Sequence, residues 1–266
     1  MDRIRSRRAG LVLAAAGLGV VALAGCQSGS GTAAPASTGS SPASTAPAPG
    51  TASASASPGL SVPGTHRTTA AYQISTPVST VVVVSHVGDV TVTGGTGTAT
   101  SVVQEADYSK TPPVTTRTVS GGTLTLTYSC PTQLVCGVAY VLRVPRDVTI
   151  QATAGAGTVQ LSGLAGHVTA QAKTGLIAAS GLSGQAVSLT TDVGAINAAF
   201  ASPPATLHAV ARVGAITLTM PGGTSYQVTT DAHVGKATVS VPTSASAGHA
   251  ITATTDVGAI RIATGA

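Results

Sequence analysis

The fold is decided by three nearly identical stretches of sequence: Val193-Gly194-Ala195-Ile196, Val213-Gly214-Ala215-Ile216 and Val257-Gly258-Ala259-Ile260. Weaker copies of the pattern are centred on four further glycines, namely Gly88, Gly157, Gly175 and Gly235. From Gly157 onward, successive glycines are 18, 19, 20, 21 and 23 residues apart. A regular period of this length is typical of proteins built from stacked repeats.

Aliphatic residues stand at fixed distances from each glycine. Seven positions before it the sequence has Val81, Ile150, Val168, Val187, Leu207, Val228 and Ile251. Four positions after it the sequence has Val92, Leu161, Ala179, Ala198, Leu218, Val239 and Ile262. The intervening positions are mostly Thr, Ser, Gln, Ala or Asn. This alternation with a period of two predicts two short strands per repeat, each with one face turned inward.

Each repeat is too small to bury its own apolar face, but a neighbour about 4.8 Å away can cover it. We therefore predict an all-β fold, a parallel β-solenoid of about seven two-strand rungs. The glycine marks a turn that needs a positive φ or a close backbone approach. The alternative is a β-sandwich of hairpins, which would not require matching columns of residues.

The period breaks between Gly88 and Gly157. Alternating segments at 101–108, 123–128 and 138–144 predict extra strands, a hairpin elaboration near the amino-terminal end of the stack. Cys130 and Cys136 flank the connection between the last two of these segments, and outside the cytoplasm such a pair is expected to form a disulfide. The rival interpretation is a metal or redox pair, but neither a His nor a third Cys is nearby.

The first 25 residues have the proportions of a signal peptide. Arg3, Arg5, Arg7 and Arg8 precede an uncharged run from Ala9 to Gly25, which is short for a spanning helix. The run ends in Leu23-Ala24-Gly25-Cys26, which resembles a bacterial lipobox whose cysteine becomes the lipidated first residue of the mature chain. The alternative is ordinary secretory cleavage beside an incidental cysteine. We expect lipidation at Cys26 and thus anchoring to the membrane.

Residues 26–68 are predicted to be a disordered linker. From Gln27 to Thr65 the sequence is almost purely Ser, Ala, Thr, Gly and Pro, without any Lys, Arg, Asp or Glu, so it has too little apolar bulk for a core. The repeats then assign residues 69–266 to a single β-solenoid domain. The signal and the linker together place this domain outside the cytoplasm, attached to the cell membrane.

Composition excludes several classes of function. Only 8% of the 266 residues are charged and 2% are aromatic, which argues against a coiled coil and against an aromatic platform for bases or sugars. The net charge of +5 is concentrated in the first eight residues; without them nine basic and seven acidic residues remain. This leaves no basic stripe to follow a phosphate backbone, so we expect no nucleic-acid partner.

The motifs together resemble a known bacterial group. The lipobox, the linker, the stretch from Cys130 through Cys136-Gly137-Val138-Ala139-Tyr140 to Val144-Pro145, and the glycine repeats are similar to the domain of unknown function 4097. Its members are also called "putative adhesin" or β-strand repeat proteins, and the likeness is to their actinobacterial lipoprotein form. The resemblance covers about residues 72 to 266 and implies a β-helical surface domain without established catalysis.

Catalysis is not expected. β-Helical lyases need clustered carboxylates, whereas the acidic residues beyond the signal are scattered: Asp89, Glu105, Asp107, Asp147, Asp192, Asp231 and Asp256. Neither a calcium-binding nonapeptide nor a Gly-x-Ser-x-Gly elbow on a strand-to-helix turn is present. We expect no metal site and no cofactor. The predicted function is adhesion or cell-wall interaction by a displayed domain; the alternative is a signalling or envelope-stress component that binds another membrane protein.

A ladder of charges is predicted along the turn edge, two positions before the glycines. In sequence order it contains Lys173, Asp192, Arg212, His233 and Asp256. Residues seven, five and three positions before the glycine point inward, so the ladder should point outward, with unlike charges on neighbouring rungs. It either holds the strand register or forms a rim that contacts a polar partner such as a wall glycan.

Overall fold

The computed structural model describes residues 65–265. The predicted signal peptide, Cys26 and nearly all of the predicted linker lie outside the described residues. Residues 66–68, which the composition assigned to the linker, are instead the first residues of strand β1 (His66–Ile74), and the ring of His66 stacks on Tyr108 at 5.5 Å. No helix within 65–265 is long and apolar enough to cross a membrane.

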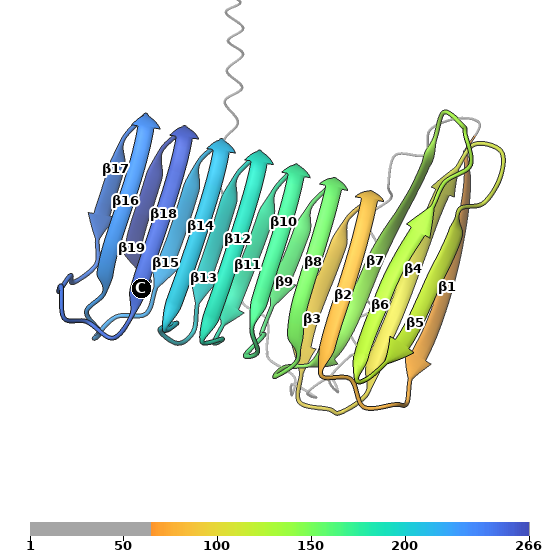
Figure 1. The fold of residues 1–266 in the computed structure, drawn as a ribbon, viewed down its shortest axis with the longest axis horizontal. Helices are drawn as coiled ribbons and strands as arrows, with labels where there is room; N and C mark the ends of the chain where they lie inside the picture. Colours follow the sequence, from red (N-terminus) through yellow and green to blue (C-terminus); the bar gives the residue numbers. More distant parts are fainter. Residues whose placement is uncertain (1–64, 266) are drawn as a thin grey trace, which may run out of the picture. The chain divides into compact units, whose positions relative to one another are not determined.

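The described chain consists of strands in two sheets (Figure 1). The ten-stranded sheet contains, in spatial order, β1, β4 (Thr100–Tyr108), β7 (Cys136–Pro145), β3 (Val90–Gly95), β9 (Val159–Ser162), β11 (Ile177–Leu182), β13 (Ile196–Phe200), β15 (Ile216–Met220), β19 (Ile260–Thr264) and β17 (Ala237–Ser240). The nine-stranded sheet contains β16 (Gln227–Val234), β18 (Ala250–Val257), β14 (Thr206–Val213), β12 (Ala186–Val193), β10 (Val168–Thr174), β8 (Thr149–Ala156), β2 (Thr80–Val87), β6 (Thr123–Ser129) and β5 (Val114–Ser120). The all-β prediction is confirmed.

The sheets are mixed rather than wholly parallel. From β7 to β17 in one sheet, and from β6 to β16 in the other, neighbouring strands pair in parallel, as repeated rungs require. At the amino-terminal end, β1 pairs with β4, β4 with β7 and β5 with β6, all antiparallel. The predicted extra strands at 101–108, 123–128 and 138–144 are β4, β6 and β7, but the hairpin of the last pair also uses β5, for which no strand was predicted. The segment β6–β7 is not a mere elaboration, because it adds a rung of its own beside β2–β3.

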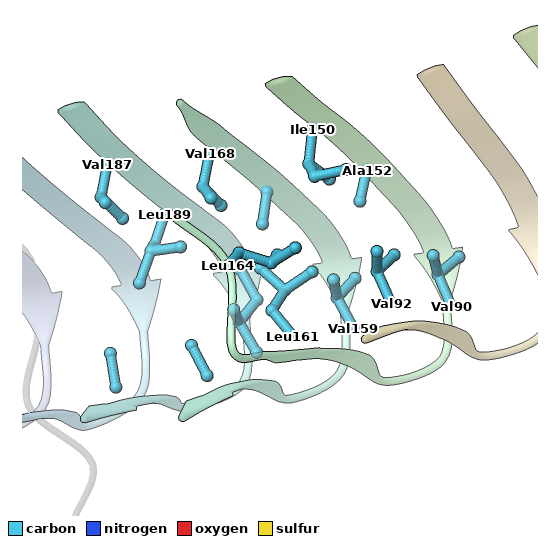
Figure 2. Packing of buried hydrophobic residues seen from close by; sticks show 14 of the residues in the cluster. Val90, Val92, Ile150, Ala152, Val159, Leu161, Leu164, Val168, Val187 and Leu189 are labelled. Atoms are coloured by element: carbon cyan, nitrogen blue, oxygen red, sulfur yellow. The ribbon is translucent and has the colours of Figure 1, made fainter. Parts of the chain in front are cut away.

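The aliphatic columns lie between the two sheets. Figure 2 shows Val168, Val187 and Leu189 on one side of this core and Val90, Val92 and Val159 on the other. Each of these six side chains is at most 1% exposed. Alanines such as Ala152, Ala170 and Ala209 occupy the column five positions before the glycine and are also buried. Burial of these columns supplies the main stabilising free energy of the fold.

Turn glycines stack on one another. Gly175, Gly194 and Gly214 have φ values of 147°, 145° and 148°, which side chains rarely adopt. A Cβ on each would overlap the carbonyl oxygen of the glycine on the adjacent rung. Glycine is therefore required both for the turn conformation and for the close approach between rungs.

The order of the rungs departs from the order of the sequence at both ends. The last segment, β18–β19, lies between β14–β15 and β16–β17, pairing with both. At the other end, β2–β3 lies between β6–β7 and β8–β9. The first and last rungs that turn at a repeat glycine, β2–β3 and β18–β19, thus lie inside the stack. We had expected the rungs to follow one another in sequence order.

The two ends of the core are closed differently. At the amino-terminal end the Arg117 guanidinium lies 4.2 Å from the centre of the Tyr72 ring, and Gln104 donates a hydrogen bond to Thr115 at 3.1 Å. At the other end, on rung β16–β17, the inward-facing Val239 is 38% exposed, whereas Ile262 in the same column of the adjacent rung is fully buried. Polar groups close the first end, and the second is more open.

Replacing Ile216 with Asp is expected to lower the free energy of unfolding by several kcal/mol, because an unpaired carboxylate would be buried between the sheets. Thr217→Asp, on the outer side of the same strand, should cost less than about 1 kcal/mol. Denaturant unfolding of both variants measures the difference, and equal losses would show that the strand faces are assigned wrongly.

The rung order is tested by two substitutions in one column. Ile262→Ala should cost about 2–5 kcal/mol because β19 is covered on both sides. Val239→Ala on the outermost rung should cost less than about 1 kcal/mol, since the side chain is partly exposed. Thermal or denaturant unfolding gives both values, and a larger loss at Val239 would mean that the rungs follow the sequence order.

Candidate functional site

The charge ladder lies on the outer side of the nine-stranded sheet. The pairing of β10 with β12 and of β12 with β14 puts Lys173, Asp192 and Arg212 on successive strands. Arg212 Nε lies 3.5 Å from Asp192 Oδ1. Because these side chains are well exposed, such a pair contributes only about 0–1 kcal/mol.

The order of the ladder differs from the order in the sequence. Asp256 follows Arg212, and His233 comes last, because β18 lies between β14 and β16. His233 Nδ1 is 3.9 Å from Asp256 Oδ1 and 3.8 Å from Asp231 Oδ1. Opposite charges therefore alternate along Lys173, Asp192, Arg212 and Asp256, an arrangement that supports strand register.

A shallow groove of about 300 Å³ crosses the outer face of the ten-stranded sheet. Gln160, Ala178 and Asn197 are aligned on the neighbouring strands β9, β11 and β13. The methyl group of Ala178 thus lies between two longer amide side chains, which explains the hollow. Thr91, Ser162, Ser180, Thr217 and Thr219 complete its polar lining.

This groove is neutral, with a cation toward each end. From β7 to β17 the strands of this sheet contain no acidic residue, and their only charged residues are Arg143 and Arg261. Arg143 is aligned with Thr93, and Arg261 with Thr217. Apolar atoms, mainly of alanines, make up most of the exposed surface of the groove, and the hydroxyl and amide groups among them both donate and accept hydrogen bonds. The face is therefore suited to a sugar chain with apolar ring faces, hydroxyl groups and occasional anions. Of the residues that the structure describes, none with a titratable side chain lines the groove.

The predicted disulfide between Cys130 and Cys136 is present. It closes the connection from β6 to β7, the position at which other rungs make their glycine turn. Within residues 65–265, no group of three or more His, Cys, Asp or Glu side chains is placed to hold a metal ion.

The acidic residues fall into separate settings. Asp147 lies 3.9 Å from Arg146, and Asp192 and Asp256 belong to the ladder. Asp89 on the β2–β3 turn and Glu105 and Asp107 on β4 line one hollow beside the disulfide. Sequence reasoning missed this gathering, because it predicted a strand at 101–108 but not the antiparallel pairing of that strand with β1 and β7.

Buried hydroxyl groups bind backbone carbonyls of the adjacent rung, another feature that sequence reasoning missed. Ser85 donates to the carbonyl of Val138 at 2.9 Å, and Thr255 donates to that of Gly214 at 3.0 Å. Both stand three positions before a turn glycine, as does Thr191. A hydroxyl at this fixed distance was the signal that could have revealed the contact.

Tyrosines gather at the amino-terminal end of the core. The Tyr128 hydroxyl donates to the carbonyl of Val87 at 2.9 Å and accepts from its N–H at 2.6 Å. Burial raises the pKa of both Tyr72 and Tyr140 above the ordinary value, so these phenols remain protonated and are poor nucleophiles. The cluster packs the amino-terminal end of the core.

No protein-family model and no curated protein matches the chain. Among solved structures, it is similar to a putative cell adhesion protein from Clostridium sporogenes, with 12% identity and a TM-score of 0.42 over 75% of this chain and 100% of the other. It is also similar to a putative adhesin from Bacteroides fragilis, with 14% identity and a TM-score of 0.43 over 75% of this chain and 97% of the other. At these values the likeness does not assign a function, and the resemblance to the domain of unknown function 4097 stays an expectation.

Proposed function

We propose that the chain is a lipid-anchored, non-catalytic binding module in which a β-solenoid is displayed outside the cell membrane and contacts the cell wall, in the manner of an adhesin. The observation that carries the proposal is the neutral groove between Arg143 and Arg261. It offers hydroxyl and amide groups on successive strands, spaced about 4.8 Å apart, without a catalytic group. A repeating polymer such as a wall glycan can use such evenly spaced contacts.

The anchor follows from the sequence that precedes the domain. The Leu23-Ala24-Gly25-Cys26 box supplies the acceptor thiol, and the linker after it allows the domain to reach beyond the membrane surface. Affinity spread over many weak polar contacts suits a tethered domain, because attachment raises its effective concentration at the wall.

Replacing Cys26 with Ala is expected to abolish fatty-acid labelling and to leave either unprocessed precursor or protein released from the membrane. Metabolic labelling combined with detergent phase partition measures this. Ser28→Ala, two residues away, is the matched control and should partition like the parent. Unchanged labelling and partition of the Cys26 variant would contradict lipidation.

The groove is tested with purified peptidoglycan sacculi in a sedimentation assay. The double variant Gln160→Ala/Asn197→Ala should bind about thirtyfold more weakly, because two amide contacts of roughly 1 kcal/mol each are lost. Gln171→Ala/Thr190→Ala, a neighbouring pair on the outer side of the other sheet, is the control. Equal binding by both double variants and the parent would exclude this groove as the wall-binding surface.

A further inference from the structure

The loop between Cys130 and Cys136 exposes a leucine completely. Leu134 is 98% exposed, more than any other large apolar side chain in residues 65–265. The standard rungs turn at this edge with a single glycine, whereas this rung inserts five residues between its two cysteines. The inserted leucine therefore contributes nothing to the core and is free to contact another molecule.

The loop is held in place from several directions. Besides the disulfide, the Gln133 side chain accepts from the N–H groups of Lys110 and Thr111 at 2.9 and 3.1 Å and donates to the carbonyl of Thr111 at 2.8 Å. The backbone N–H of Ser109 donates to the carbonyl of Val135 at 3.0 Å. Much of the entropy cost of ordering this loop is thus met during folding, which favours binding through it.

Leu134 borders a hollow of about 570 Å³. Its apolar lining includes Leu134, Val135 and Val87, of which Val87 is 51% exposed. Asp89 and Glu105 lie on its charged side. The hollow therefore combines an apolar contact surface with carboxylates.

The carboxylates leave the hollow with a net negative charge. Arg67 Nε and Nη2 donate to Asp107 Oδ1 and Oδ2 at 2.8 and 3.1 Å, and this pairing raises the pKa of the guanidinium above its ordinary value. Asp89 Oδ1 accepts from the N–H of Thr158 at 2.7 Å. Among the described residues, the Glu105 side chain makes no hydrogen bond and no close ion pair, although its charge also contributes to the raised pKa of Arg67. Three carboxylates against one guanidinium give a net charge of −2.

We infer that this surface docks a basic segment of another extracytoplasmic protein, in which an apolar side chain packs against Leu134 and Val87 and an adjacent lysine or arginine meets Glu105 and Asp89. Charge complementarity selects the cation, and the exposed leucine on a braced loop has the character of an interface anchor. The site is separate from the sheet groove, so it goes beyond wall binding and gives the displayed domain a protein partner.

The test uses the full mature chain in detergent micelles and three labelled hexapeptides: one of alternating Lys and Leu, one with Glu in place of Lys, and one with Ser in place of Leu. Fluorescence anisotropy should show binding of the Lys/Leu peptide only. Leu134→Ser should weaken that binding about tenfold, and Glu105→Gln about threefold with a smaller dependence on salt.

Val141→Ser is the matched control, because this valine is also exposed on β7 but does not line the hollow. It should bind the Lys/Leu peptide like the parent. Leu134 makes no core contact, so Leu134→Ser should keep the parent melting temperature. Equal binding of the Glu/Leu and Lys/Leu peptides, or no loss in Leu134→Ser, would overturn the proposal. Sacculus binding is measured on the same variants, and its failure in the parent chain would affect only the wall-binding proposal.

Discussion

The stacking of glycine on glycine is the constraint on which the architecture depends. Each turn glycine lies so close to the carbonyl of the next that a side chain would collide with it. This contact keeps adjacent rungs in one register, and the register puts every aliphatic column between the sheets. The same register aligns the amides of Gln160 and Asn197 on either side of Ala178 and so creates the groove. The glycine turn thus determines both the alignment of the aliphatic columns in the core and the alignment of the side chains that form the groove.

Much of the repeat architecture was predictable from the sequence, because strand alternation around a fixed glycine is a short-range pattern. The mixed pairing at the amino-terminal end was not, since β1, β4 and β5 belong to no repeat. The rung order was also missed, although a signal existed. Inward positions of the outermost rung carry Val228, Thr230 and Ala237, whereas the matching positions of the next carry Ile251, Ala253 and Ile260. The rung with the smaller and more polar inward side chains lies at the end of the stack, where it is covered on one side only.

The surfaces were harder to predict than the core. The ladder was found because its members share a fixed position relative to the glycines, and only its order was wrong. The groove depends on the sizes of side chains from different strands, and the hollow depends on β4 and on the braced loop around Leu134. Contacts between side chains of different strands produce no periodic pattern in a single sequence. The residues of the groove and of the hollow therefore could not be told from ordinary polar or loop residues.

The exchange of rung order has a consequence for fraying. In a solenoid whose rungs follow the chain, the outermost repeat ends in a free tail and can peel away one strand at a time. Here the outermost rung β16–β17 is joined to an interior rung at both of its chain ends, because β15 precedes it and β18 follows it. The chain enters this rung from an interior rung and returns to another interior rung, so the rung has no free end. The segment β18–β19, which ends at Thr264, can detach only if it loses its strand partners on both sides at once. Fraying is therefore not expected to start from a free strand at the more open end of the stack.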